Sequence, residues 1–325
     1  MRRFFLFLLV GTGLLGAAFF FWGRPEQAEE HSWGVTFSHS QAESLGLDWQ
    51  ETYLALLDDL GVRHFRIPVY WDELEKERGS FDFSSWDWQL RELEERNGKV
   101  ILAMGLKLPR WPECRMPSWA AELPQQELER AVLDMLSAVT LHYRDLEVVE
   151  TWQVENEYLI PFGECPERRK EFLGEEAELV RSLDGRPVML TDGGIASFWL
   201  ESGRYADILG FSVYRFREDE TFGFLRYPFP PATFWLKAQF LHLFYPDKKV
   251  VVTELQAEPW PITGTLEGDY ETMNPAQFRE HIAYAKQTGF DEFYLWGAEW
   301  WYWTKEKTDD PRIWNYAKEI FQPTE

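Results

Sequence analysis

Two glutamates stand at the ends of two predicted strands that are far apart in the sequence. Glu157 follows the apolar run VVETWQV (148–154), and Glu254 lies near the end of KVVVTEL (249–255). If both strands belong to one closed barrel, their carboxyl ends meet at the same mouth. Two carboxyl groups facing each other across a cleft are what glycoside hydrolysis requires, one as acid/base and the other as nucleophile or base. The alternative is two ordinary glutamates in water, which becomes less attractive because both stand at strand ends.

The rest of the chain must supply the elements that position this pair. Short runs dense in Val, Ile, Leu and Phe alternate with helical patterns, as is typical of parallel strands buried on both faces. The predicted strands are 32–37, 62–70, 99–105, 148–154, 186–191, 206–214, 249–255 and 291–297. Helices are predicted over 48–60, 125–143, 166–183, 275–287 and 310–320.

Eight strand–helix units predict an α/β fold of the (β/α)8 TIM-barrel type over residues 32–325. A doubly wound sheet is the alternative. That fold would normally carry a Gly-rich phosphate turn after its first strand, and WGVTFSHSQ (33–41) has none.

The N-terminus predicts a single transmembrane helix before the barrel. Residues 4–22 carry no charged side chain, and a helix of that length rises about 28 Å, which is the thickness of a bilayer core. Arg2 and Arg3 would stay on the cytoplasmic side. We therefore expect a membrane anchor over 1–23 and a linker over 24–31, with the barrel outside the cytoplasm. A cleaved signal peptide, giving a secreted protein, is the competing interpretation, although Phe and Trp occupy 19–22 where small residues are expected.

The composition of the chain limits the classes of molecule that it could bind. Asp and Glu total 55 against 33 Lys and Arg, a net charge of -22 that repels phosphate backbones and argues against a nucleic acid partner. The chain is 17% aromatic, with 17 Trp. Flat aromatic faces stack on pyranose rings, so Trp111 and Trp260, which follow predicted strands, are candidate sugar contacts. Core or loop packing is the alternative.

Further polar residues stand at the strand ends. Glu258 and Glu299 are candidates for binding sugar hydroxyls, or are loop carboxylates in water. Glu155 is expected to be structural, because strand position places Glu157 further out. No HxH, HExxH or GxSxG pattern occurs, and we expect neither a metal nor a cofactor.

Asn156-Glu157 closing the fourth predicted strand and Thr253-Glu254 closing the seventh resemble the signature of glycoside hydrolase clan A. That clan comprises retaining (β/α)8 glycosidases, among them the cellulase-like family 5. The resemblance implies Glu157 as the general acid/base, Glu254 as the nucleophile and Asn156 as a contact to the sugar 2-hydroxyl. It leaves the individual family open, because no clear His stands near the fourth to seventh strands.

Three more residues carry the resemblance. Arg66 in RIPVYW is similar to the clan's second-strand Arg, which holds the nucleophile ionised. Tyr214 is similar to its sixth-strand Tyr, and Trp296 to the eighth-strand Trp that floors the subsite of the cleaved sugar. From the residues alone, Arg66 near Glu254 favours an ionised nucleophile, and the charge of Glu254 favours a raised pKa at Glu157.

Cys114 and Cys165 fall in the loops after the third and fourth predicted strands, at one end of the barrel. Outside the cytoplasm this favours a disulfide between them, with two free thiols as the alternative. The aromatic segment 222–245 is expected to be a helix packed on the barrel, or else to rest in lipid headgroups.

Together these patterns predict a retaining glycoside hydrolase that cleaves β-linked glycans by double displacement, with an oligo- or polysaccharide as its partner. A transglycosidase using the same residues is the rival within the class. A non-catalytic glycan-binding barrel is the rival outside it.

Overall fold

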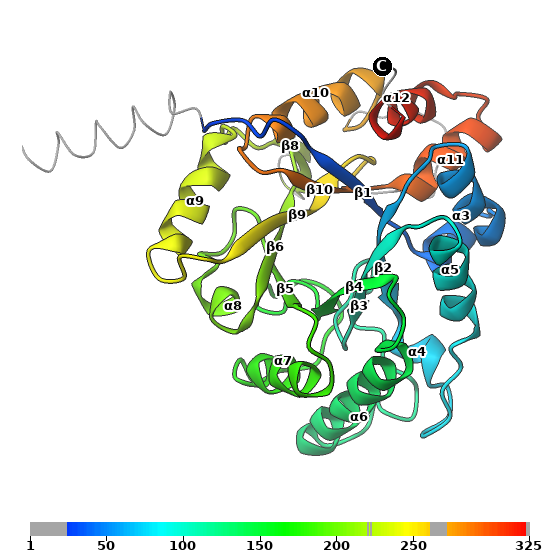
Figure 1. The fold of residues 1–325 in the computed structure, drawn as a ribbon, viewed down its shortest axis with the longest axis vertical. Helices are drawn as coiled ribbons and strands as arrows, with labels where there is room; N and C mark the ends of the chain where they lie inside the picture. Colours follow the sequence, from blue (N-terminus) through cyan, green and yellow to red (C-terminus); the bar gives the residue numbers. More distant parts are fainter. Residues whose placement is uncertain (1–24, 220, 222, 261–271, 323–325) are drawn as a thin grey trace, which may run out of the picture.

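The computed structural model describes residues 25–219, 221, 223–260 and 272–322. Eight parallel strands close into a barrel in the order β1-β2-β3-β4-β5-β6-β9-β10, with β10 pairing back to β1 (Figure 1). The strands are β1 Ser32–Thr36, β2 His64–Val69, β3 Lys99–Met104, β4 Val149–Val154, β5 Val188–Asp192, β6 Ile208–Val213, β9 Lys249–Gln256 and β10 Glu292–Trp296. The predicted TIM barrel and its eight strands are confirmed, and closure excludes the doubly wound sheet.

Helices surround the barrel (Figure 1). They are α2 His39–Ser44, α3 Trp49–Asp58, α4 Trp71–Leu74, α5 Ser84–Glu94, α6 Gln125–Tyr143, α7 Phe172–Leu183, α8 Leu200–Tyr205, α9 Ala232–His242, α10 Pro275–Lys286, α11 Ala298–Lys307 and α12 Arg312–Phe321. A hairpin of β7 Phe216–Asp219 and β8 Gly223–Arg226 follows β6.

Local sequence sets the helix starts. The Asp48 side chain accepts hydrogen bonds from the first backbone N–H groups of α3, and Asn274 does the same for α10, which has Pro at its first position. Helix α6 has its predicted bounds, whereas α7 begins at Phe172 rather than at residue 166. Helix α11 is not among the predicted helices, and its Trp300, Trp301 and Trp303 are buried.

Side chains that point inward from the strands fill the interior of the barrel. Ile101, Met189, Val251 and Tyr294 come from four strands and pack together as one cluster. Gly34 on β1 makes room for the Tyr294 ring, because a Cβ there would lie 2.6 Å from a ring carbon. The barrel interior is therefore a packed core, and a site is expected at its carboxyl-terminal mouth.

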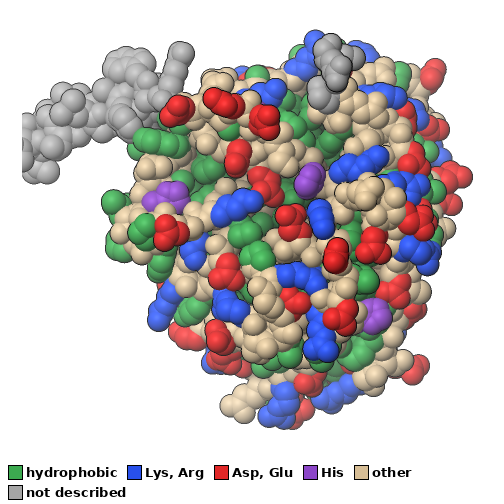
Figure 2. Space-filling model, viewed as in Figure 1, with side chains coloured by type: hydrophobic (Ala, Val, Ile, Leu, Met, Phe, Trp, Pro, Cys, Tyr) green, Lys and Arg blue, Asp and Glu red, His purple; other side chains and the backbone are tan. Residues whose placement is uncertain are grey.

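The predicted membrane anchor, residues 1–23, lies outside the described residues. Among the residues that are described, no helix is long and apolar enough to cross a bilayer. On the face shown in Figure 2, acidic and basic side chains are interspersed and no continuous basic area is visible.

The predicted disulfide is confirmed. Cys114 and Cys165 are bonded, with their Cα atoms 5.1 Å apart, and they join the loop after β3 to the loop after β4. The backbone N–H of Glu164 also donates to the Pro112 carbonyl at 2.9 Å. The two loops that border the mouth on this side therefore form one unit.

We expect a double Cys114→Ser, Cys165→Ser variant to be less stable by up to about 4 kcal/mol, because the cross-link spans 51 positions and restricts the unfolded chain. Thermal unfolding with and without reductant measures this. Reductant should lower the melting temperature of the natural protein toward that of the variant and leave the variant unchanged. Equal melting temperatures for all four samples would contradict a stabilising disulfide.

Candidate active site

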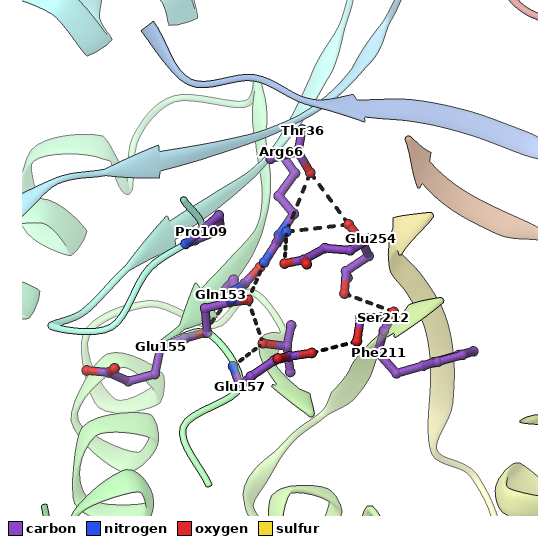
Figure 3. Close-up of polar contacts among 12 residues, drawn as sticks. Thr36, Arg66, Pro109, Gln153, Glu155, Glu157, Phe211, Ser212 and Glu254 are labelled. Carbon is purple, nitrogen blue, oxygen red and sulfur yellow. Dashed lines mark hydrogen bonds and ion pairs between the residues drawn. The ribbon is translucent and has the colours of Figure 1, made fainter. Parts of the chain in front are cut away.

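The structure brings the two predicted glutamates into the same mouth. Glu157 follows the end of β4, and Glu254 lies within β9, nearly opposite in the barrel. Figure 3 shows both side chains pointing into the centre of the mouth. Glu157 and Glu254 are close enough for the charge of one to alter the titration of the other.

Two donors hold the Glu254 carboxylate. Arg66 Nη1 lies 2.9 Å from one oxygen, and the Tyr214 hydroxyl donates to the other at 2.9 Å (Figure 3 shows the arginine contact). Arg66 is fully buried and Glu254 is nearly so. A charge-assisted bond and a hydroxyl donor together fix the orientation of this carboxylate.

Arg66 also reaches the end of β4. Its Nη2 donates to the Asn156 side-chain oxygen at 2.6 Å, and its Nε donates to the Gln153 side-chain oxygen at 2.6 Å. The Thr191 hydroxyl donates to the same Asn156 oxygen at 3.1 Å. Since that oxygen has two donors, the amide nitrogen of Asn156 is the group that can donate to a substrate.

Glu157 has a different environment. The Ser212 hydroxyl donates to its carboxyl group at 2.6 Å, and its backbone N–H donates to Thr191 Oγ1 at 2.8 Å. Burial, followed by the negative charge of Glu254, raises the pKa of Glu157 to about 8. The group is therefore protonated at neutral pH, as a general acid must be.

Glu155 points away from the mouth (Figure 3). Its two oxygens accept the backbone N–H groups of Leu106 and Lys107, each at 2.7 Å. A side chain at Gly105 would collide with this carboxylate, because a Cβ there would lie 2.7 Å from its oxygen. Glu155 joins the loops after β3 and β4, which agrees with the structural role expected for it.

Lys107 follows β3, and no pattern in the sequence distinguishes it from a solvated lysine. Its fully buried Nζ donates to the backbone oxygens of Glu157 at 2.9 Å and Ile160 at 2.8 Å, and pairs with Glu113 at 3.2 Å. Glu157 has a φ of 43°, in the left-handed region. Lys107 stabilises this unusual backbone by holding the carbonyl groups that follow it.

Glu258 and Glu299 are not loop carboxylates in water, because both are buried. Arg110 pairs with Glu258 at 2.5 Å and with Glu299 at 2.7 Å, and its guanidinium lies 4.1 Å from the centre of the Trp296 ring. The second Glu299 oxygen accepts the Ser38 backbone N–H at 2.6 Å. Arg110, which the sequence marks only as a strand-end residue, therefore fixes the Trp296 ring at the mouth.

An aromatic row leads from solvent toward Glu254. Trp111, 63% exposed, packs edge-on against Phe162 with ring centres 5.8 Å apart. Phe162 lies 6.2 Å from Trp260, and Trp260 lies 5.3 Å from Tyr214, which donates to Glu254. The structure thus connects the two predicted tryptophans through Phe162, which has no distinguishing signal in the sequence. A cavity of about 390 Å³ adjoins Trp111 on the side of the loops after β1, β2 and β3.

Within the part of the chain that the structure describes, no group of three or more His, Cys, Asp or Glu side chains could hold a metal ion. The polar groups of the mouth are instead paired carboxyl groups with arginine, tyrosine and serine partners. This arrangement can donate a proton from one carboxyl group and attack with the other.

No protein-family model matches the chain, and no curated protein sequence matches it. Solved structures do resemble it. A β-galactosidase from the haloarchaeon Halorubrum lacusprofundi shares 15% identity, with a TM-score of 0.59 over 90% of this chain and 58% of that one. A GH5_18 protein from Streptomyces cattleya, in complex with GlcNAc, shares 14% identity, with a TM-score of 0.57 over 83% of this chain and 70% of that one.

Endo-glycoceramidase II from a Rhodococcus species, as a lactosyl-enzyme intermediate, also matches at 14% identity. Its TM-score is 0.54, over 84% of this chain and 75% of that one. The chain spans 50–58% of the length of the β-galactosidases that it matches. At these identities the likeness shows the fold.

Proposed function

We propose that the chain is a retaining glycoside hydrolase that cleaves β-linked glycans by double displacement. The observation that carries the proposal is the contrast between the surroundings of two carboxyl groups in one mouth. Glu254 has Arg66 and Tyr214 as donors, whereas burial beside Glu254 keeps Glu157 protonated. The similar structures include β-galactosidases, an exo-β-1,4-mannosidase and an endo-glycoceramidase, which supports glycosidase chemistry on this barrel.

In the first step, the Glu254 carboxylate attacks the anomeric carbon of the sugar. The bond from that carbon to the leaving oxygen breaks, and the Glu157 proton passes to the oxygen. An ester between Glu254 and the sugar results. As the resemblance implies, Asn156 donates to a sugar hydroxyl and the Trp296 ring forms the floor of the sugar subsite.

In the second step, water attacks the same carbon while Glu157 takes its proton and Glu254 leaves. The esterified Glu254 carries no charge. One of the causes that raise the pKa of Glu157 is therefore absent in the intermediate, and the pKa falls toward a value suited to a base. A single pair of residues can thus change roles between the steps.

Substrate binding is assigned to the aromatic row that ends at Tyr214. Trp111 and Trp260 offer ring faces to an oligo- or polysaccharide. A transglycosidase would share both glutamates and would pass the sugar to an acceptor hydroxyl instead of water. Product analysis with and without added acceptor sugar distinguishes the two.

We also propose that the enzyme lies outside the cytoplasm. Residues 4–22 are uncharged and long enough to span a bilayer, and the disulfide suits an oxidising compartment. Secretion after cleavage of this segment is the alternative. Mass measurement of the N-terminus of the protein from a membrane fraction separates them.

Glu254→Gln should reduce turnover by about a thousandfold or more, because an amide cannot form the glycosyl ester. Labelling with a panel of 2-fluoro glycosides followed by peptide mapping should place the sugar on Glu254 of the natural protein. Glu292→Gln, at the other end of the barrel, is the matched control and should retain full activity. An active Glu254→Gln protein with no labelled peptide at 254 would refute the assignment.

The loss of activity caused by Glu157→Ala should depend on the leaving group of the substrate. Aryl glycosides with acidic phenols need little protonation, so their kcat/KM should change by less than about tenfold, whereas alkyl glycosides should lose about 10²–10⁴-fold. Steady-state kinetics over a series of leaving groups measures the difference. An equal loss on every substrate would argue that Glu157 has no acid role.

The pH profile follows from the raised pKa of Glu157. Only its protonated form can act as the acid, so kcat/KM for alkyl glycosides should fall as pH rises through about 8. For an activated aryl glycoside, Glu157→Gln should have no such alkaline limb. A profile of the natural protein that stays flat to pH 10 would contradict the assignment of Glu157.

A further inference from the structure

A compact apolar patch lies on the outside of the barrel at the end of α9. Its members are Phe240, 42% exposed, Leu243, 76% exposed, and Phe244, 57% exposed, and the two phenylalanine rings lie 5.5 Å apart. We call these three residues the α9 patch. The opposite side of α9 packs on the barrel, with Phe234, Ala238 and Leu241 buried. The packing expected for segment 222–245 therefore accounts for one side of α9 and leaves the other apolar and exposed.

The α9 patch lies at the end of the barrel that is opposite the mouth. The chain runs from Phe244 directly into the start of β9 at Lys249, which pairs with Ile208 at the start of β6. Lys248 Nζ donates to the carbonyl of Ala206, just before β6. These contacts place the patch at the amino-terminal end of the strands, whereas Glu157 follows the carboxyl end of β4.

The chain enters the barrel at this same end. Pro25 lies against Gly289, three residues before β10, and the Ser32 N–H at the start of β1 donates to the Asp291 carbonyl at 2.7 Å. Strands β6, β9, β10 and β1 are consecutive neighbours in the barrel. The entry point and the α9 patch therefore belong to one side of the amino-terminal end, and Figure 1 shows α9 and the start of β1 on the same side.

Almost no spacer separates the apolar N-terminal segment from the barrel. The uncharged run ends at Trp22, and Pro25 already packs on the barrel, so only Gly23 and Arg24 lie between. The three steps from Trp22 to Pro25 span at most about 11 Å when extended. If residues 4–22 cross a bilayer, as the proposed function has it, the amino-terminal end of the barrel must lie at the membrane surface.

We infer that the α9 patch rests in the headgroup region of that bilayer, as a second contact beside the proposed anchor. Aromatic and aliphatic side chains favour this boundary, where apolar surface is covered and the neighbouring polar groups stay wet. The surrounding charges are mixed, with Asp207 and Asp247 near Lys248, so the contact is apolar rather than electrostatic. The inference rests on the proposed anchoring of residues 4–22.

This contact fixes the orientation of the barrel. With the amino-terminal end on the membrane, the mouth with Glu157 and Glu254 opens away from it. The substrate is then a glycan that lies beyond the membrane surface, and not a sugar headgroup of the same bilayer. That restricts the substrate class more than the fold or the catalytic pair does.

The test uses the full chain in phosphatidylcholine vesicles and one introduced thiol. Both natural cysteines are in the disulfide, so Leu243→Cys can be labelled alone with an environment-sensitive dye. Phe198→Cys is the matched control, because Phe198 is 79% exposed and lies in the loop after β5, at the mouth end. Lipids with a spin label near the headgroup should quench the dye at 243 at least fivefold more than at 198, equally at low salt and at 1 M salt.

The outcomes separate the two proposals. Flotation with the vesicles tests the anchor first, and failure to float overturns both the anchoring and the orientation. A chain that floats with equal, weak quenching at both positions keeps the anchor and overturns the contact of the α9 patch. Stronger quenching at 198 would show that the mouth faces the membrane and would reverse the inferred substrate class.

Discussion

The site depends on one buried cation. Arg66 has no solvent exposure, and its guanidinium donates to Glu254 on β9 and to Asn156 and Gln153 at the end of β4. A buried charge is tolerated only when it is paired and its donors are satisfied. A shift of β4 or β9 relative to β2 would break hydrogen bonds of Arg66 and leave its charge unpaired. The contacts that pair the arginine therefore also fix the distance between β4 and β9 at the mouth.

Around this cation, two residues of one type have different surroundings. Glu254 accepts hydrogen bonds from a charged donor and from a hydroxyl, one on each oxygen. The carboxyl group of Glu157 has only the Ser212 hydroxyl as a side-chain donor among the described residues, and desolvation and the charge of Glu254 oppose its ionisation. The difference between the acid and the nucleophile that we propose therefore comes from neighbouring residues, and not from the glutamates themselves.

Much of the fold could be predicted from the sequence because parallel strands buried on both faces are apolar throughout, and so were recognisable along the whole chain. The disulfide could be predicted because both cysteines follow neighbouring strands. The contacts of Lys107 and Arg110 could not be predicted from the sequence. Each joins loops that are more than forty positions apart, and nothing local distinguishes a lysine that donates to backbone oxygens from one that is solvated. Trp301 shows that position alone can also mislead. It follows a strand, as a sugar-binding residue would, but its side chain is buried in α11.

The end of β4 has a consequence for how such sequences are compared. Glu155 and Glu157 both have left-handed backbone, with φ of 59° and 43°. The Glu155 side chain points away from the mouth, and the Glu157 side chain points into it. The backbone N–H of each residue from Glu155 to Glu157 is already bonded, to Met104, Lys107 and Thr191 in turn. Each backbone N–H of this stretch is held, so an insertion or deletion of one residue would bring Asn156 to the position of one of the two glutamates. An alignment of distant relatives that opens a gap between 154 and 158 is therefore misplaced, whatever its score elsewhere.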